Sequence, residues 1–182
     1  MILSFPLRSA FLALPLTGEA KRRFAAIVEN LALIGDSVRF QHVTSPHLTL
    51  QFWPELAQTE LEDVLDQSQK IAAASKLFEI AVTGAGTFGS HGHDKVLFLS
   101  VHPSPELEAV KKRCPWPSDR PFAPHITLAR IKHPDRFAVQ KERALKLLQD
   151  VRFTVRFDRL RLYGEVERVK QTALEDFLFR RL

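Results

Sequence analysis

The chain has 182 residues, of which 45% are hydrophobic and 26% are charged, a composition that excludes an intrinsically disordered protein. Its formal net charge of +5 favours a polyanionic partner such as nucleic acid. The single cysteine, Cys114, excludes an internal disulfide and a thiolate metal cluster, which predicts a cytoplasmic protein.

Hydrophobic periodicity predicts alternating strands and helices along the first half of the chain. The apolar run in residues 10–16 loosely resembles a short signal peptide, but no basic residue precedes Arg8, two prolines interrupt the apolar stretch, and the run is too short to span a membrane. We therefore interpret it as strand and expect no membrane partner. The elements expected in this half are a strand over 8–14, a helix capped by Thr17, a strand over 38–41, a strand from His47 that ends at Pro54, and a helix over about 61–72.

The second half shows the same alternation, with turn-length links between neighbouring elements. Here we expect strands over 78–83 and 96–102 joined by a glycine-rich link over 84–92, a helix from Ser104 to about Arg113, a proline-rich loop over 114–125, a strand over 125–130, a helix over about 135–148, strands over 151–157 and 160–163, and a last apolar run near 173–179.

A short motif occurs once in each half, as His47-Leu48-Thr49-Leu50 and as His125-Ile126-Thr127-Leu128. This internal repeat predicts a two-lobed, pseudo-symmetric α+β fold in a single domain over residues 1–182. On a strand the His and Thr of each copy share one face, while the aliphatic residues point to the opposite face. One face would therefore join the core and the other would be free for chemistry.

Two histidines suit phosphodiester chemistry, because one accepts a proton from the nucleophile while the other donates a proton to the leaving oxygen. Threonine hydroxyls two residues further on would donate hydrogen bonds to the phosphate oxygens. For one such triplet a structural role is the commoner explanation. Two copies that share residue type, parity and a preceding proline, Pro46 and Pro124, favour a paired site that needs no metal and no cofactor.

A further triplet, His42-Val43-Thr44, lies close to the first motif in HVTSPHLTLQF. It runs into Pro46 and lacks the leucine that would anchor the far face of a strand. His42 also lies an odd number of residues from His47, so on one continuous strand the two would face opposite ways. We therefore interpret His42 as lying outside the site.

The segments SPHLTLQF and RPFAPHITLAR, together with RSAFLALPLTGEAKRRF, FEIAVTGAGTFGSHGHDKVLFLSV and FDRLRLY, resemble the 2H phosphoesterases. Within them the chain is most similar to the RNA 2′,3′-cyclic phosphodiesterases, also called 2′-5′ RNA ligases. The resemblance implies antiparallel sheets with helices outside and the two motifs facing each other across a central cleft. The family usually continues its first motif as Phe-Leu-Gly, whereas this chain has Phe52-Trp53-Pro54, so the turn after that strand must differ.

Carried over to this chain, the resemblance implies that His47 protonates the leaving 3′ oxygen, His125 activates water, and Thr49 and Thr127 hold the phosphate. The product would be RNA that ends in a 2′-phosphate, and the reverse step with a 5′-hydroxyl RNA would form a 2′-5′ linkage. The partner implied is RNA with a 2′,3′-cyclic phosphate end, and a monomer would suffice.

Arg130 matches a basic position often found after the second motif and would contact phosphate. Its strand parity opposes that of His125, so a bulge or a strand end is needed to turn it inward. Phe122 precedes the second motif and would either stack on a base or pack in the interior.

Three alternatives remain at this level. The same two-histidine site would also suit a 2′-5′ oligoadenylate or a small cyclic nucleotide, and a module that binds RNA ends without turnover would keep the same residues. A metal site in His91-Gly92-His93-Asp94 is disfavoured, because no third or fourth ligand follows at a recognisable spacing.

Overall fold

The computed structural model describes residues 3–90, 93–118 and 121–180. The elements in chain order are β1 (Leu7–Pro15), α1 (Gly18–Asn30), the 3₁₀ helix η1 (Ala32–Ile34), β2 (Val38–Phe40), β3 (His47–Leu56), α2 (Gln58–Ala73), β4 (Phe78–Ser90), β5 (His93–Val101), α3 (Pro105–Lys112), β6 (His125–Ile131), α4 (Pro134–Leu148), β7 (Phe153–Phe157), β8 (Arg159–Val166) and β9 (Val169–Leu178). This order of strands and helices confirms the predicted α+β class.

In the described part of the chain, nine strands form one sheet in the order β7-β4-β5-β6-β3-β1-β8-β9, with β2 paired to β6 beside this path. All neighbouring pairs are antiparallel. The order is symmetric about the junction of β3 and β6. Moving outward from that junction, β3, β1, β8 and β9 in one half correspond to β6, β5, β4 and β7 in the other.

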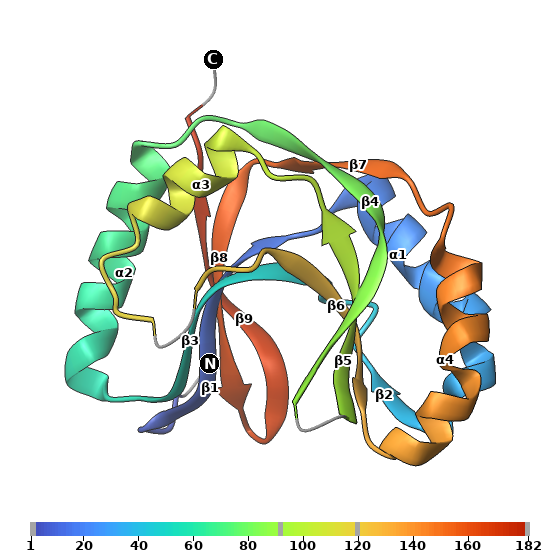
Figure 1. The fold of residues 1–182 in the computed structure, drawn as a ribbon. Coiled ribbons are helices and arrows are strands. Elements are labelled where there is room, and N and C mark those ends of the chain that lie inside the picture. Colours follow the sequence, from blue (N-terminus) through green and yellow to red (C-terminus); the bar gives the residue numbers. More distant parts are fainter. Residues whose placement is uncertain (1–2, 91–92, 119–120, 181–182) are drawn as a thin grey trace.

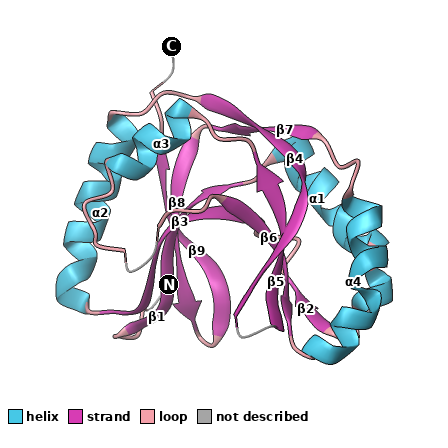
Figure 2. Ribbon diagram, in the orientation of Figure 1, coloured by secondary structure: helices cyan, strands magenta, loops and turns pink. Residues whose placement is uncertain are grey.

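The helices lie outside the strands, with α2 and α3 on one flank and α1 and α4 on the other (Figure 1, Figure 2). Helix α2 packs on β8 and β9, whereas α4 packs on β4 and β5 and α1 on β7. We call the sheet face covered by helices the outer face and the opposite one the inner face. No helix in the described ranges is both long and apolar enough to cross a membrane.

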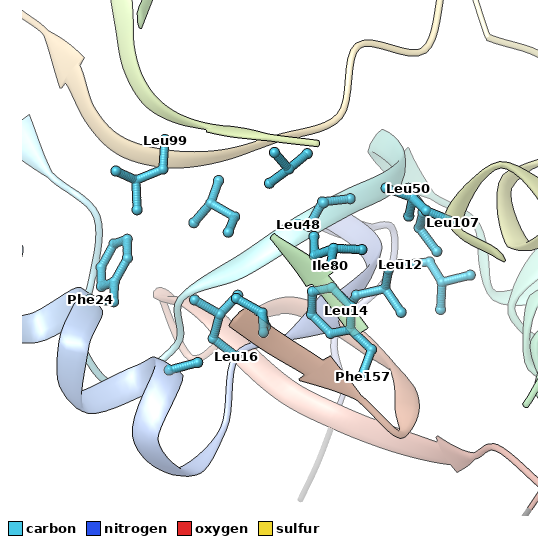
Figure 3. Close-up of a cluster of buried hydrophobic side chains, with 14 of the residues drawn as sticks. Leu12, Leu14, Leu16, Phe24, Leu48, Leu50, Ile80, Leu99, Leu107 and Phe157 are labelled. Atoms are coloured by element: carbon cyan, nitrogen blue, oxygen red, sulfur yellow. The ribbon is translucent and has the colours of Figure 1, made fainter. Parts of the chain in front are cut away.

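The core lies between the outer face and the helices, where strands and helices contribute aliphatic and aromatic side chains (Figure 3). Phe24 of α1 and Phe137 of α4 are fully buried, as are Leu48, Ile126 and Leu128 of the two motifs. Each such side chain stabilises the fold by roughly 1.5 to 3 kcal/mol through burial. The aliphatic residues of both motifs therefore anchor their strands from the outer face, as the parity predicted.

The expectation that β3 ends at Pro54 was wrong, because the strand continues to Leu56. Pro54 lies between the paired residues Trp53 and Glu55, opposite Ser9, whose φ of 49° interrupts regular β1 geometry. Among the described residues, β3 pairs beyond Leu48 only with β1, so no strand lies along its other edge. A proline is tolerated at such an edge because no ladder hydrogen bond needs its missing N–H.

The glycine-rich stretch over 84–92 was also misjudged as a link. Most of it belongs to a long β4–β5 hairpin whose strands extend to Ser90 and from His93. Gly86 explains the glycine content in part, since a Cβ there would lie 2.9 Å from the ring of Phe98. Glycine thus marks a close approach between neighbouring strands here, not a loop.

Of the two helix caps predicted from the sequence, only one makes a side-chain hydrogen bond. Ser104 caps α3 by accepting a hydrogen bond from the Leu107 N–H at 3.4 Å, and Pro105 occupies the first turn, as expected. Thr17 takes the cap position of α1 but makes no side-chain hydrogen bond there.

Candidate active site on the inner face

The two motif strands meet where Leu48 of β3 pairs with Ile126 of β6. Extending this antiparallel register by one residue each way sets His47 across from Thr127 and Thr49 across from His125. All four side chains are half-buried, whereas the aliphatic neighbours of each motif are buried. The junction thus gathers two imidazoles and two hydroxyls on the inner face with approximate two-fold symmetry.

Each motif strand carries a bulge at the same position. In β3, Thr49 pairs with Ala13 and Gln51 with Leu12, which leaves Leu50 unpaired. In β6, Thr127 pairs with Phe98 and Ala129 with Leu97, which leaves Leu128 unpaired. An extra residue reverses the alternation of side chains along the rest of the strand.

The bulges decide which later residues join the inner face. In β6 Leu128 and Ala129 are both buried, and Arg130 then emerges on the face of His125. The sequence required a bulge or a strand end to turn Arg130 inward, and the structure has a bulge. In β3 the corresponding residue is Phe52, which pairs with Phe11 and is 52% exposed.

The carbonyl oxygen of each bulged leucine accepts a hydrogen bond from a different donor. The Leu50 carbonyl accepts from Lys111 Nζ at 2.7 Å, and the Leu128 carbonyl accepts from the Gln41 backbone N–H at 2.8 Å. The carbonyl oxygen of each bulged leucine thus has a hydrogen-bond partner beside the core.

His47 is held by an aromatic cluster and a backbone carbonyl. Its ring stacks on Phe11 at a centroid distance of 4.6 Å and lies 5.5 Å from Tyr163. The pKa of His47 is lowered to about 4, mainly by burial and also by the positive charges of His125 and Arg130, while the hydrogen bond to the Ser45 carbonyl opposes this shift. The Ser45 carbonyl lies 2.8 Å from Nδ1 and is only an acceptor, so Nδ1 carries the proton and Nε2 is the free nitrogen.

His125 has the corresponding environment in the other half. Its ring lies edge-on to Phe88 at 4.9 Å and to Phe98 at 5.5 Å. Its Nδ1 lies 2.7 Å from the Ala123 carbonyl, so Nε2 is again the free nitrogen. Burial lowers the pKa of His125, the Ala123 hydrogen bond raises it, and the charge of Arg130 lowers it.

Arg130 therefore contributes to the low pKa of both histidines. Replacing Arg130 with Met removes a positive charge that opposes protonation, so we expect the pKa values of His47 and His125 both to rise. Imidazole titration by NMR measures the two values separately. Arg39→Met is the matched control, because Arg39 lies across from Arg130 on β2, whereas the charges that lower the two pKa values are those of His125 and Arg130. Unchanged or lower pKa values in Arg130→Met would contradict the expectation.

Phe122 lies apart from the histidines in its recorded contacts. Its ring packs against the main core, and Lys111 Nζ lies 5.6 Å from its centroid. This location favours the packing alternative, and a role in stacking stays a prediction. His42 is exposed and follows β2, outside the two motif strands, and its place outside the site stays a prediction.

Several inner-face residues escaped the sequence analysis. Phe11 and Tyr163 form a small cluster with Ala13 that is separate from the main core, and Phe98 was not considered. For Phe11, the alternation of side chains along β1 could have indicated the inner face, because Phe11 and Ala13 point away from the side of Leu12 and Leu14. The stretch in which a metal site was disfavoured lies partly outside the described residues, since His91 and Gly92 are not among them, while Asp94 forms an ion pair with Lys141 at 2.8 Å.

The chain is similar to proteins of known name. A protein of Geobacillus stearothermophilus named RNA 2′,3′-cyclic phosphodiesterase is 28% identical over 128 residues, which are 66% of this chain and 41% of that protein. The chain thus spans less than half the length of that relative. A Thermotoga maritima protein of the same name is 25% identical over 165 residues, which are 85% of this chain and 84% of that protein.

Comparison with solved structures agrees on the fold. A Thermus thermophilus protein, TT0787, superposes with a TM-score of 0.70 at 25% identity, over 94% of this chain and 98% of that one. Escherichia coli LigT complexed with 3′-AMP gives 0.68 at 18% identity, over 96% and 99% of the two chains. The profile of the 2′-5′ RNA ligase superfamily matches residues 20–167, which is most of this chain. The resemblance to 2H phosphoesterases is confirmed, and the chain belongs to the 2′-5′ RNA ligase superfamily.

Proposed function

We propose that the protein is an RNA 2′,3′-cyclic phosphodiesterase that opens a terminal cyclic phosphate to a 2′-phosphate. The observation that carries the proposal is the pair of His-x-Thr strands joined at Leu48 and Ile126, in which both histidines present a free Nε2. The names of the relatives from Geobacillus and Thermotoga point to the same reaction. In this proposal residues 1–182 act as one domain.

The reaction proceeds in one displacement at phosphorus. His125 Nε2 accepts a proton from water as the water oxygen bonds to phosphorus, and the bond from phosphorus to the 3′ oxygen breaks. Protonated His47 gives its Nε2 proton to that leaving oxygen. The low pKa of His47 keeps its imidazole neutral in the free protein at neutral pH, and a bound phosphodiester anion favours the charged form that the step requires.

The remaining inner-face residues bind the substrate in this proposal. Thr49 and Thr127 donate hydrogen bonds to the nonbridging oxygens, and the Arg130 guanidinium balances the charge that grows on them. Phe52 and Phe88 are 52% and 38% exposed, so they offer surfaces on which RNA bases stack. The reverse step, with a 5′-hydroxyl RNA in place of water, would form a 2′-5′ linkage.

The test uses protein treated with EDTA and an oligonucleotide that ends in a 2′,3′-cyclic phosphate. We expect conversion to a 2′-phosphate, because two imidazoles supply both proton transfers without a metal. A 3′-phosphate product would reverse the assigned leaving group and with it the roles of His47 and His125. An intact substrate that nevertheless binds would contradict the proposal and support a non-catalytic module.

Substrate size separates the remaining enzymatic alternatives. A polymer that releases counterions on binding should show a steep dependence of kcat/KM on salt, whereas a small cyclic nucleotide or a short 2′-5′ oligoadenylate should show a shallow one. For the location we propose the cytosol, because the lone Cys114 leaves no partner for an internal disulfide.

A further inference from the structure

The tip of the β8–β9 hairpin contains an unusual backbone conformation. Gln171 has a φ of 59°, in the left-handed region that residues other than glycine occupy at a free-energy cost. It belongs to a bulge, because Val169 pairs with Val166 and Thr172 with Gly164, so two β9 residues face one residue of β8. A costly conformation at a non-glycine residue persists where other contacts hold it.

Those contacts are hydrogen bonds from the Gln171 amide to the segment that follows β2. Gln171 Oε1 accepts from Gln41 Nε2 at 2.6 Å and from Ser45 Oγ at 3.0 Å, and Gln171 Nε2 donates to Gln41 Oε1 at 3.2 Å. All three groups are partly buried. The amide therefore has partners for both its oxygen and its nitrogen, and it fixes a segment more than a hundred residues earlier in the chain.

The fixed segment, residues 41–46, leads directly into His47. The carbonyl of Ser45 accepts the Nδ1 proton of His47, and the backbone N–H of Gln41 donates to the bulged Leu128 of the other motif strand. The middle of the segment is exposed and is closed by one backbone hydrogen bond, from the Ser45 N–H to the His42 carbonyl at 3.1 Å. The Ser45 carbonyl also lies 3.5 Å from Gln41 Nε2, part of the same amide that Gln171 contacts, and the Pro46 carbonyl accepts from the Leu16 N–H at 2.9 Å. The side-chain contacts of Gln171 with Gln41 and Ser45 therefore help to place the Ser45 carbonyl.

We propose that Gln171 is a positioning residue for His47. Its amide holds residues 41–46 so that the Ser45 carbonyl keeps His47 in the Nδ1–H tautomer, with Nε2 directed to the inner face. This role rests on the proposed function only in that His47 takes part in the reaction. His125 is the internal reference, because its Nδ1 is held by Ala123, in a different loop.

The variant that tests the proposal is Gln171→Gly. Glycine adopts a φ of 59° without strain, so this change removes the amide while relieving the backbone, and the hairpin should fold. We expect kcat for a cyclic phosphate substrate to fall about tenfold with KM within about twofold, since misorientation affects the reacting group and not the phosphate contacts. Gln41→Ala should have a similar effect, and the double variant should lose little more than either single one.

Thr172→Val is the matched control on the same hairpin. The Thr172 hydroxyl donates only to the Val169 carbonyl in the recorded contacts, at 2.9 Å within the hairpin, so its loss should leave kcat unchanged. An equal fall in kcat for Thr172→Val would overturn the proposal, because it would trace the effect to general loosening of the hairpin. A Gln171→Gly protein that keeps the wild-type kcat would overturn it as well.

Nitrogen-15 NMR of the imidazoles gives a readout that does not depend on turnover. In the wild type we expect His47 and His125 both to be Nδ1–H tautomers at neutral pH. In Gln171→Gly the Nε2–H form of His47 should appear while His125 stays unchanged; a His47 that keeps the pure Nδ1–H form would overturn the proposal. If the wild type opens no cyclic phosphate, the proposed function fails, but the tautomer measurement still decides the role of Gln171.

Discussion

Replacing His125 with alanine is expected to lower kcat for a 2′,3′-cyclic phosphate end by about 10² to 10⁴, the usual contribution of one proton transfer. His47→Ala should have an effect of the same size. The double variant should fall well short of the product of the two losses, because the imidazoles act in one step. The measurement is the rate of 2′-phosphate formation at saturating substrate.

Two controls make this result specific. His42→Ala removes an exposed imidazole only five residues before His47 and should retain full activity. Because the His47 ring stacks on Phe11, alanine could destabilise the strand, so His47→Gln keeps most of the side-chain volume and should lose activity equally. Retained substrate binding with lost turnover identifies catalysis. Full turnover in His125→Ala would exclude the two-histidine mechanism.

Thr49→Val and Thr127→Val are each expected to lower kcat by about 10² to 10³, as for the loss of one hydrogen-bond donor to an oxyanion. Valine keeps the branched shape and the strand propensity of threonine, so the fold should be preserved. The approximate two-fold symmetry predicts losses of similar size in the two halves. Steady-state kinetics gives the ratios, and circular dichroism checks the fold.

Thr44→Val provides the comparison for these variants. Thr44 lies in the other His-x-Thr triplet, is exposed and belongs to the turn before β3 rather than to a motif strand. Wild-type kcat is expected for this protein. A change of less than about threefold in both Thr49→Val and Thr127→Val would contradict a role for these hydroxyls in transition-state stabilisation.

The local geometry of the motifs was predictable from the sequence because strand alternation is a property of the backbone alone. His47 and Thr49 share a face, Leu48 is buried opposite, and the second motif repeats this pattern. The same alternation rule placed Arg130 on the face opposite to His125, and the bulge in β6 brings it back to the face of His125. The motif roles themselves came from the family resemblance and stay predictions.

What the sequence did not reveal depends on partners distant in the chain. The side chain of Gln171 contacts Gln41 from a bulge in the β8–β9 hairpin, and no local sequence pattern predicts that bulge. Pro54 and Gly86 were read as breaks in regular structure because their tolerance depends on a free strand edge and on the ring of Phe98. Propensity describes one strand at a time, whereas these outcomes depend on the neighbouring strand.

The junction of the two halves has a mechanical consequence. Between β3 and β6 the register contains only the pair Leu48 and Ile126, whereas the pairings within each half extend over many residues. The junction therefore has a shorter ladder than the pairings within either half, and the two motifs lie on opposite sides of it. A rotation of one half against the other about this pair would change the separation of His47 from Thr127 and that of His125 from Thr49 together. In the proposed function, the acid and the base would then approach the phosphate as a unit.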